Sequence, residues 1–361
     1  MESRHRVVVG DAREMDAVGD DAVELVVTSP PYPMIEMWDD QFAELSRDAA
    51  DALAAGDGAA AFDAMHEVLA DVWREVKRVL VPGGIACVNV GDATRKVDDS
   101  FRVYQNHARV VEAFADLGFE PLPDVLWRKP TNSAAKFMGS GMIPPNAYVT
   151  LEHEYVLVFR NGSRSRSFDP GDSARYESAY FWEERNRWFS DVWTDVTGAS
   201  QRMAGAGDAA DASDDAGSLG EMRERSAAYP FEVPYRLINM YSVYGDTVLD
   251  PFWGTGTTSL AAMVAGRNSV GVELEAGFAD AFDRRVANAP ALSREVATRR
   301  LDDHREFVAR RREEGETFEY ESETYEFPVT TKQERSLTLY AVDEVTETDE
   351  GYRARHEPVG R

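Results

Sequence analysis

The stretch Thr28-Ser-Pro-Pro-Tyr32 places a hydroxyl, a rigid turn and an aromatic ring within five residues. An exocyclic amine of a nucleobase is a poor nucleophile, because its lone pair is delocalised into the ring. The Ser29 hydroxyl and the Pro30 carbonyl could accept both amine N–H groups and orient the lone pair toward a methyl donor. Pro30 and Pro31 fix the backbone, and Tyr32 offers a flat face to a base turned out of a duplex. A turn that only ends a strand is the alternative.

The second stretch of chemical interest, Asp250-Pro-Phe-Trp-Gly-Thr-Gly-Thr-Thr258, connects an apolar strand to a helix of small residues. Gly254 and Gly256 let backbone N–H groups approach a ligand at the positive end of that helix. Glu273 ends the next strand, where doubly wound folds bind ribose hydroxyls. Ser259 replaces the third glycine of the dinucleotide fingerprint, which disfavours NAD and leaves other adenosine-bearing cofactors open. A glycine turn kept only for packing is the alternative.

The elements that must position these stretches alternate between apolar strands and amphipathic helices, which predicts a mainly parallel sheet covered on both faces. Asp11 follows the first strand and faces the crevice where such sheets bind ligands. A helix N-cap is an alternative role for Asp11, compatible with the first. We expect strands at 6–10, 24–28, 85–90, 122–127 and 154–159, and helices at 12–18, 60–80 and 101–117.

The composition is strongly acidic, with a net charge of −26, and only five of its 39 basic residues are lysine. Acid-rich, lysine-poor composition is typical of proteins that stay hydrated in concentrated salt, so we read the charge as a halophilic solvent adaptation. The single cysteine, Cys87, excludes an internal disulfide and lies in an apolar run that predicts a core position. We expect no bound metal and, since no apolar run approaches membrane-spanning length, a soluble cytoplasmic protein without membrane contact.

Residues 161–226 break the alternation and concentrate arginine and aromatic side chains. In an acidic chain this concentration suits phosphate contact, guanine recognition and base stacking. A small satellite core with solvated charges is the alternative. The residues that we expect to bind DNA are Arg164, Arg166, Arg185, Arg187 and Trp188.

The two chemical stretches and four blocks between them resemble, in this order along the chain, the β class of DNA amino-methyltransferases. The blocks between them are Glu75–Gly84, Asn89–Asp92, Trp127–Pro130 and Glu152–Glu154. The resemblance covers roughly residues 5 to 290. One departure is Tyr229-Pro230, which stands where the family often has His-Pro.

The resemblance implies an α/β fold, a Rossmann-like, seven-stranded, S-adenosylmethionine-dependent methyltransferase sheet that is circularly permuted. The implied domains are a catalytic half at 1–160, a target recognition region at 161–226 and an S-adenosylmethionine-binding half at 227–290. Residues 291–361 then form a small C-terminal extension of helices and β hairpins.

Carried onto this sequence, the family motifs assign two sets of site residues. The catalytic set, which holds the target base, is Ser29, Pro30, Pro31 and Tyr32. The cofactor-binding set is Asp11, Thr28, Asp250, Pro251, Phe252, Gly254, Gly256, Thr257, Thr258 and Glu273.

The implied reaction transfers a methyl group from S-adenosylmethionine to the N4 amine of cytosine in double-stranded DNA after base flipping. Ser29, rather than aspartate, resembles the cytosine-N4 members, and the string at 29–38 resembles archaeal CTAG-modifying enzymes. Adenine N6 remains an alternative target, and a non-catalytic S-adenosylmethionine-binding or RNA-associated factor is the alternative from another class. A restriction endonuclease partner and an orphan enzyme are both compatible with the sequence.

The acidic composition generates a prediction about salt. Because 65 carboxylates repel one another less when they are screened, the melting temperature should rise between about 0.1 M and about 3 M KCl. Thermal unfolding followed by circular dichroism measures this. A melting temperature that falls over this range would contradict the halophilic interpretation.

Overall fold

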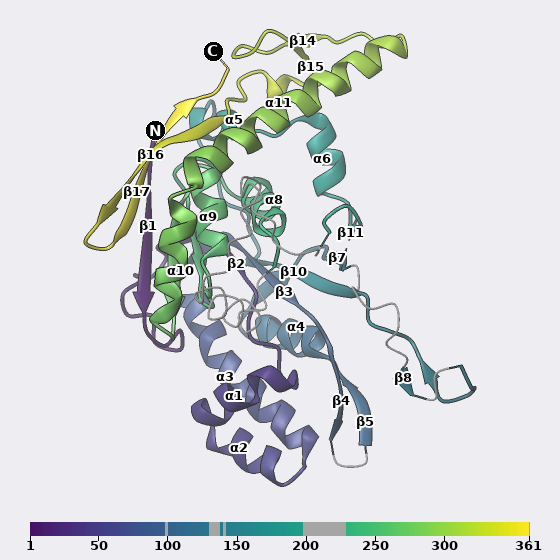
Figure 1. The fold of residues 1–361 in the computed structure, drawn as a ribbon. Coiled ribbons are helices and arrows are strands. Elements are labelled where there is room, and N and C mark those ends of the chain that lie inside the picture. The colour runs from purple at the N-terminus through teal and green to yellow at the C-terminus, as the bar shows by residue number, and fades with distance from the viewer. Residues whose placement is uncertain (98–99, 130–137, 140–141, 198–228, 361) are drawn as a thin grey trace, which may run out of the picture.

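The computed structural model describes residues 1–97, 100–129, 138–139, 142–197 and 229–360. One sheet of eleven strands runs through them (Figure 1). Its order is β11 (Val192–Trp193), β7 (Val125–Arg128), β10 (His153–Asn161), β3 (Leu80–Val90), β2 (Val23–Thr28), β12 (Thr247–Asp250), β13 (Asn268–Glu273), β1 (Glu2–Val9), β17 (Gly351–Pro358) and β16 (Tyr340–Thr348), with β6 (Phe119–Pro121) also pairing with β10.

The sheet is mixed and larger than the seven strands predicted. Strands β3, β2, β12, β13 and β1 are parallel, whereas β10 runs antiparallel to β3 and to β7. The seven neighbours from β7 to β1 are extended by β11, by β6 and by the C-terminal hairpin of β17 and β16. The extension occurs because β1 would otherwise present an open edge, and β17 pairs with residues 2–6 of it.

Helices cover both faces of the sheet (Figure 1). Alternate residues of β2 point to opposite faces: Val26 packs with α3 (Gly58–Val79) and α4 (Asn106–Asp116), while Leu25 and Val27 pack with α8 (Glu232–Tyr241) and α9 (Thr257–Val264). The fold is therefore an α/β structure with its core in two layers, one on each side of the sheet.

The remaining elements pack over the two strands of the C-terminal hairpin or lie at the ends and edges of the sheet. They are η1 (Glu36–Trp38), α1 (Asp39–Leu45), α2 (Arg47–Ala54), α5 (Ser173–Glu177), α6 (Trp182–Trp188), α10 (Gly277–Val286), α11 (Ala289–Glu313), η2 (Lys332–Glu334), and the strand pairs β4 (Ala93–Val97) with β5 (Ser100–Tyr104), β8 (Met138–Gly139) with β9 (Ala147–Tyr148), and β14 (Tyr320–Glu321) with β15 (Pro328–Val329).

Two predicted helices differ from the structure. Residues 12–18 form turns, because the Glu75 carboxylate accepts from the Met15 N–H while Arg78 donates to the carbonyls of Met15 and Val18. These tertiary hydrogen bonds replace helical ones. The helix expected at 101–117 begins only at 106, since residues 100–104 pair with β4 in a hairpin.

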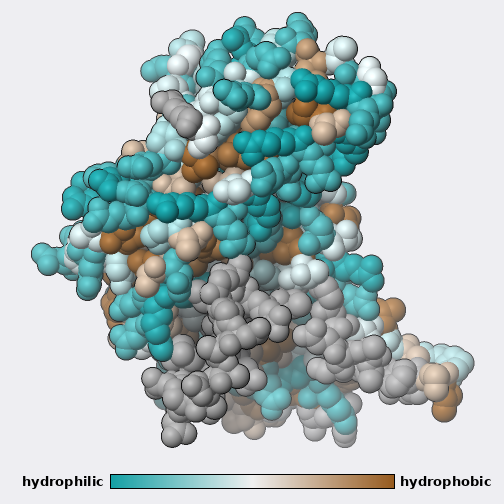
Figure 2. Space-filling model, turned by 45° about the horizontal axis from the view of Figure 1, so that its top comes forward, coloured by the Kyte–Doolittle hydropathy of each residue, from teal (hydrophilic) through white to brown (hydrophobic). Residues whose placement is uncertain are grey.

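The surface that Figure 2 presents is mainly hydrophilic, in keeping with the acidic composition. Within the part of the chain that the structure describes, no helix is both long enough and apolar enough to cross a membrane.

A buried ion pair joins α6 to α11. The Arg300 guanidinium donates from Nε and Nη2 to the two Glu184 oxygens at 2.6 and 2.8 Å, and both side chains are buried. The guanidinium also lies over the Trp188 ring, 5.3 Å from its centroid. Because each charge depends on the other for compensation, the pair fixes α6 against α11.

Glu184→Gln should therefore destabilise the protein by about 3–5 kcal/mol, the range for leaving one buried charge uncompensated. The matched control is Asp302→Asn, which removes an exposed partner of Arg305 on the same helix and should change stability by less than about 1 kcal/mol. Urea unfolding of both variants gives the comparison. Similar small effects in both variants would mean that the buried pair does not hold α6 in place.

Candidate functional site

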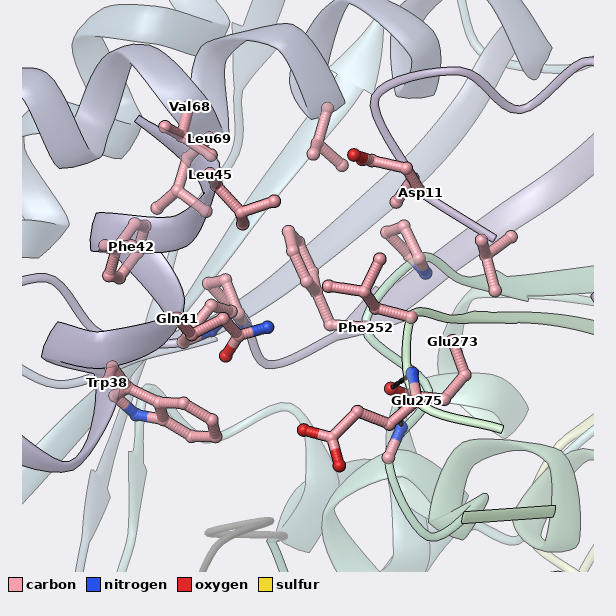
Figure 3. A pocket seen from close by; sticks show the side chains of 18 of the residues that line it. Asp11, Trp38, Gln41, Phe42, Leu45, Val68, Leu69, Phe252, Glu273 and Glu275 are labelled. Atoms are coloured by element: carbon pink, nitrogen blue, oxygen red, sulfur yellow. Dashed lines mark hydrogen bonds between the residues drawn. The ribbon is translucent and has the colours of Figure 1, made fainter. Parts of the chain in front are cut away.

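A pocket of about 500 Å³ opens at the carboxyl ends of β1, β2, β12 and β13 (Figure 3). This volume suits a nucleotide-sized ligand, and the carboxyl edge is where open α/β sheets bind ligands. The predicted site residues that line it are Asp11, Ser29, Pro30, Pro31, Tyr32, Pro251, Phe252, Gly254 and Glu273. Both chemical stretches of the sequence therefore contribute to one pocket.

Five predicted cofactor residues lie outside the lining of this pocket: Thr28, Asp250, Gly256, Thr257 and Thr258. The four of them that carry a side chain beyond hydrogen are buried. Thr28 and Asp250 end β2 and β12, whose following loops line the pocket, and Thr257 and Thr258 begin α9. Their position points to a role in holding these loops rather than in touching a ligand.

Asp250 is the centre of the contacts behind the pocket. Its carboxylate accepts hydrogen bonds from the Thr28 and Thr258 hydroxyls, both at 2.6 Å, and from the Phe252 N–H at 3.1 Å. Burial raises the pKa of Asp250 to about 6, although the three donors favour its charged form. The Tyr229 hydroxyl bonds to Thr258, so the residue that departs from the family pattern supports the same cluster.

The glycine turn bends around the buried Trp253. Gly256 has φ 73°, and a Cβ there would lie 2.4 Å from Phe282 and 2.8 Å from Trp253. Only glycine fits such a close approach at positive φ. The turn delivers the chain into α9, whose first N–H groups face the carboxyl edge of the sheet.

The Glu273 side chain stabilises the glycine turn through hydrogen bonds and faces the pocket (Figure 3). One oxygen accepts from the Gly254 N–H at 2.7 Å and the other from the Glu275 N–H at 2.8 Å. Burial raises the pKa of Glu273, and these backbone donors oppose that shift. At the end of the neighbouring strand β1, hydrogen bonds from Arg13 lower the pKa of Asp11.

The opposite wall, which the sequence did not predict, combines apolar and aromatic side chains with Asp40, Gln41 and Glu44 of α1. It is contributed by η1, α1 and α3, whose side chains point into the pocket in Figure 3: Trp38, Phe42, Leu45, Val68 and Leu69. The helical pattern over 60–80 predicted a buried face for α3 but not that part of this face borders a ligand pocket. Carboxylates on one wall and apolar or aromatic faces on the other suit an adenosine-bearing cation such as S-adenosylmethionine.

The Tyr32 hydroxyl connects the catalytic loop to three polar side chains that the sequence analysis did not assign to the site. Asn89 donates to it at 2.9 Å, and Tyr32 lies 3.1 Å from Glu154 Oε2. Lys129 in turn donates to Glu154 Oε1 at 2.7 Å. Burial raises the pKa of Tyr32 well above its ordinary value, so the phenol stays protonated. The sequence did contain a sign that these residues belong to the site: Asn89, Lys129 and Glu154 each lie in one of the blocks that resemble the family.

Two of the predicted DNA-binding residues lie at the wrong end of the sheet. Arg164 and Arg166 pass beside Gly83 near the start of β3, whereas the pocket lies where the parallel strands end. Arg166 is also held by the Asp246 carboxylate through hydrogen bonds of 2.6 and 2.8 Å.

The other three lie on α6, which Figure 1 shows at the end of the molecule opposite α1 and α3. Trp188 is only 1% exposed, so the prediction that it stacks on DNA is wrong. Arg187 pairs with Asp303, and the Arg185 guanidinium lies over the Phe189 ring. The satellite core that was the alternative describes this segment better, and residues 198–226 of the predicted recognition region lie outside the described residues.

The described residues do not favour two other chemistries, a cysteine nucleophile and a metal centre. Burial raises the pKa of the Cys87 thiol, which disfavours the thiolate that a nucleophile requires. Over the residues whose placement is described, no three His, Cys, Asp or Glu side chains group in the manner of a metal site.

Comparison with known proteins agrees with this geometry. The model of the N6/N4 DNA methylase family matches residues 23–284. The type II methyltransferase M.MthZI of Methanothermobacter thermautotrophicus is 49% identical over 342 residues, which is 94% of this chain and 91% of that protein. M.MjaI of Methanocaldococcus jannaschii is 45% identical over 79% of this chain and 91% of its own length.

A solved structure is similar as well. TTHA0409 of Thermus thermophilus, in complex with S-adenosyl-L-methionine, superposes with a TM-score of 0.58 at 31% identity, covering 79% of this chain and 93% of that one. The large mixed sheet of this protein is therefore the α/β fold of a methyltransferase of this kind.

The geometry around Glu273 generates a prediction about the cofactor. Glu273→Gln removes a charged acceptor from the pocket wall and one brace of the turn, so the affinity for S-adenosylmethionine should fall by about 1–3 kcal/mol. Calorimetric titration measures the loss. Asp280→Asn, an exposed acid-to-amide change on α10 outside the pocket lining, is the control and should bind like the parent. Unchanged affinity in Glu273→Gln would remove this residue from the cofactor site.

Proposed function

The chain belongs to the N6/N4 DNA methylase family and uses S-adenosylmethionine, and from this premise we propose that it methylates the N4 amine of cytosine in duplex DNA. The observation that carries the proposal is the neutral hydroxyl of Ser29 at the pocket, within the rigid turn of Pro30 and Pro31. A neutral acceptor at this position is what the sequence analysis associated with cytosine-N4 rather than adenine-N6 chemistry.

The catalytic loop orients the amine. Ser29 Oγ and the Pro30 carbonyl accept its two N–H groups, so its lone pair points across the pocket. When bound, S-adenosylmethionine supplies the methyl group as an electrophile and retains the electron pair of the broken S–C bond. The Tyr32 ring, packed against Gly91, lines the pocket as the stacking face for the flipped base.

The cofactor-binding set divides into two roles. Glu273 accepts from ribose hydroxyls, and Asp11, Pro251, Phe252 and Gly254 form the walls around the donor. The buried set of Thr28, Asp250, Gly256, Thr257 and Thr258 maintains the shape of the turn from behind. This division of roles supports binding of S-adenosylmethionine between the loop after β2 and the loop after β12.

The order of the loops along the chain supports a circularly permuted arrangement. The catalytic loop after β2 comes first, and the cofactor loop after β12 comes more than two hundred residues later, although β2 and β12 are neighbours in the sheet. The two halves, 1–160 and 227–290, are accordingly proposed as the catalytic and cofactor-binding halves of one methyltransferase domain.

The DNA contacts are proposed for two arms that project from the carboxyl edge of the sheet, one after β3 and one after β7 (Figure 1). They are the β4–β5 hairpin and the segment around β8 and β9. The exposed rings of Phe101 and Tyr148 stack with centroids 5.3 Å apart and join the two arms. Met142 and Ile143 are 86% and 70% exposed, and hydrophobic side chains gather at the tip of the projecting arm in Figure 2. Exposed aromatic and apolar groups of this kind contact bases and sugar faces with little help from net charge.

The biological setting follows from the relatives. M.MthZI and M.MjaI are named type II methyltransferases, and their identity over most of the chain supports a type II modification enzyme here. The local string at 29–38 supports CTAG as the target. A restriction endonuclease that recognises the same site would be its partner.

The product identifies the reaction. Nucleoside mass spectrometry of DNA treated with the protein should find N4-methylcytosine, and Ser29→Ala should reduce kcat by about 10²-fold because it removes one positioned polar group. The exposed Ser163→Ala change is the control and should leave kcat unchanged. N6-methyladenine as the product would overturn the cytosine assignment, and the absence of any methylated nucleoside would favour a binding factor instead.

A further inference from the structure

Methylation of an amine leaves a proton to be removed, and the catalytic loop is connected to a carboxylate that could receive it. Ser29 Oγ lies 3.0 Å from the Tyr32 hydroxyl oxygen, which lies 3.1 Å from Glu154 Oε2. Glu154 is 9% exposed, on β10, and Tyr32 stands between it and the pocket. The chain of contacts therefore runs from the pocket into the body of the protein.

The direction of each hydrogen bond follows from counting protons. Asn89 Nδ2 and Lys129 Nζ both donate to Glu154, each at 2.7 Å, so this carboxylate acts as an acceptor. The single proton of Tyr32 then points to Glu154, and the Tyr32 oxygen accepts from Asn89. Ser29 must be the donor in its contact with Tyr32, because Tyr32 has no second proton to give.

This arrangement leaves the lone pairs of Ser29 Oγ free of Tyr32 and available to the substrate amine. Every donor in the chain then points the same way, from the pocket through Ser29 and Tyr32 to Glu154. The opposite orientation of the Asn89 amide would set its oxygen against the Glu154 carboxylate, which is repulsive, so the amide orientation supports the same direction.

We propose that Ser29, Tyr32 and Glu154 form a proton relay that carries the proton lost by the methylated amine to Glu154, with Asn89 and Lys129 as positioning residues. The proposal rests on the proposed amine methylation, whether the base is cytosine or adenine. It assigns to Tyr32 a role in proton transfer beyond stacking.

The relay balances in atoms and charge. The amine lone pair forms the N–CH3 bond, the S–CH3 bond breaks with its electron pair left on sulfur, and the nitrogen becomes positively charged. The amine N–H proton passes to Ser29 Oγ, the Ser29 hydroxyl proton passes to Tyr32, and the Tyr32 proton passes to Glu154 Oε2. Ser29 and Tyr32 end neutral, the product amine is neutral, and Glu154 carries the proton that solvent later removes.

Packing keeps the relay aligned. A Cβ at Gly91 would lie 3.1 Å from Cε2 of Tyr32 and 3.3 Å from Cγ of Glu154, so the glycine lets both side chains approach the backbone. Lys129, 45% exposed, provides a link from Glu154 toward solvent. Close packing on Gly91 therefore favours the 3.1 Å contact between the Tyr32 hydroxyl and Glu154.

A double-mutant cycle tests the relay. Tyr32→Phe keeps the ring and removes the hydroxyl, Glu154→Gln keeps the shape and removes the acceptor, and the third protein combines both changes. Single-turnover methyl transfer should slow by about 10²-fold in each single variant, the scale of lost acid–base assistance. The combined variant should be no slower than either one, because both changes break the same chain.

The control and the binding measurements distinguish a relay from a purely structural role of these side chains. Glu152→Gln alters a half-exposed carboxylate two residues away, paired with Arg128, and should transfer methyl at the parental rate. The affinities of both single variants for S-adenosylmethionine and for DNA should equal those of the parent, which also reports that each variant is folded.

Parental rates in Glu154→Gln or in Tyr32→Phe would overturn the relay, as would losses that add up in the combined variant. A wild-type protein that methylates no nucleoside would instead overturn the proposed function.

Discussion

The site depends on one buried carboxylate. Asp250 accepts from Thr28, which ends β2 immediately before the catalytic loop, from Phe252 in the cofactor loop, and from Thr258 at the start of α9. These hydrogen bonds join segments more than two hundred residues apart in sequence. Because a buried carboxylate depends on its hydrogen-bond donors, these contacts hold the loop after β2 and the loop after β12 at a fixed separation.

Local sequence predicted those parts of the site that are made by short-range structure. The strand β13 has the predicted end at Glu273, and the turn around Gly256 leads into α9 as expected, since a positive φ and a crowded Cβ position demand glycine. Sequence order could not reveal that Asn89 and Glu154 contact Tyr32 or that Lys129 contacts Glu154, because these contacts depend on β10 running antiparallel between β3 and β7. The turns at 12–18 escaped prediction for the same reason, as long-range hydrogen bonds from α3 determine them.

The arginine and aromatic content of residues 161–226 predicted DNA contacts there. Composition, however, does not specify which end of a sheet a segment covers. Several aromatic side chains of this segment are core residues, among them Phe181 and Trp188, and the Arg300 guanidinium packs over the Trp188 ring. Exposed aromatic and apolar residues also occur on the two arms, where Phe101 and Tyr148 stack on each other. In a chain of net charge −26, the DNA contacts proposed for these arms would make binding less dependent on phosphate attraction, which high salt weakens.

The central claim is that one pocket holds the methyl donor against the Glu273 side and the target base against the Ser29 side. A crystal structure of the protein with S-adenosylhomocysteine and a CTAG duplex measures this most directly. The account predicts a flipped cytosine whose N4 lies about 3 Å from Ser29 Oγ and from the Pro30 oxygen, with the two arms on the DNA. A base that remains stacked in the duplex, or that binds away from Ser29, would contradict it.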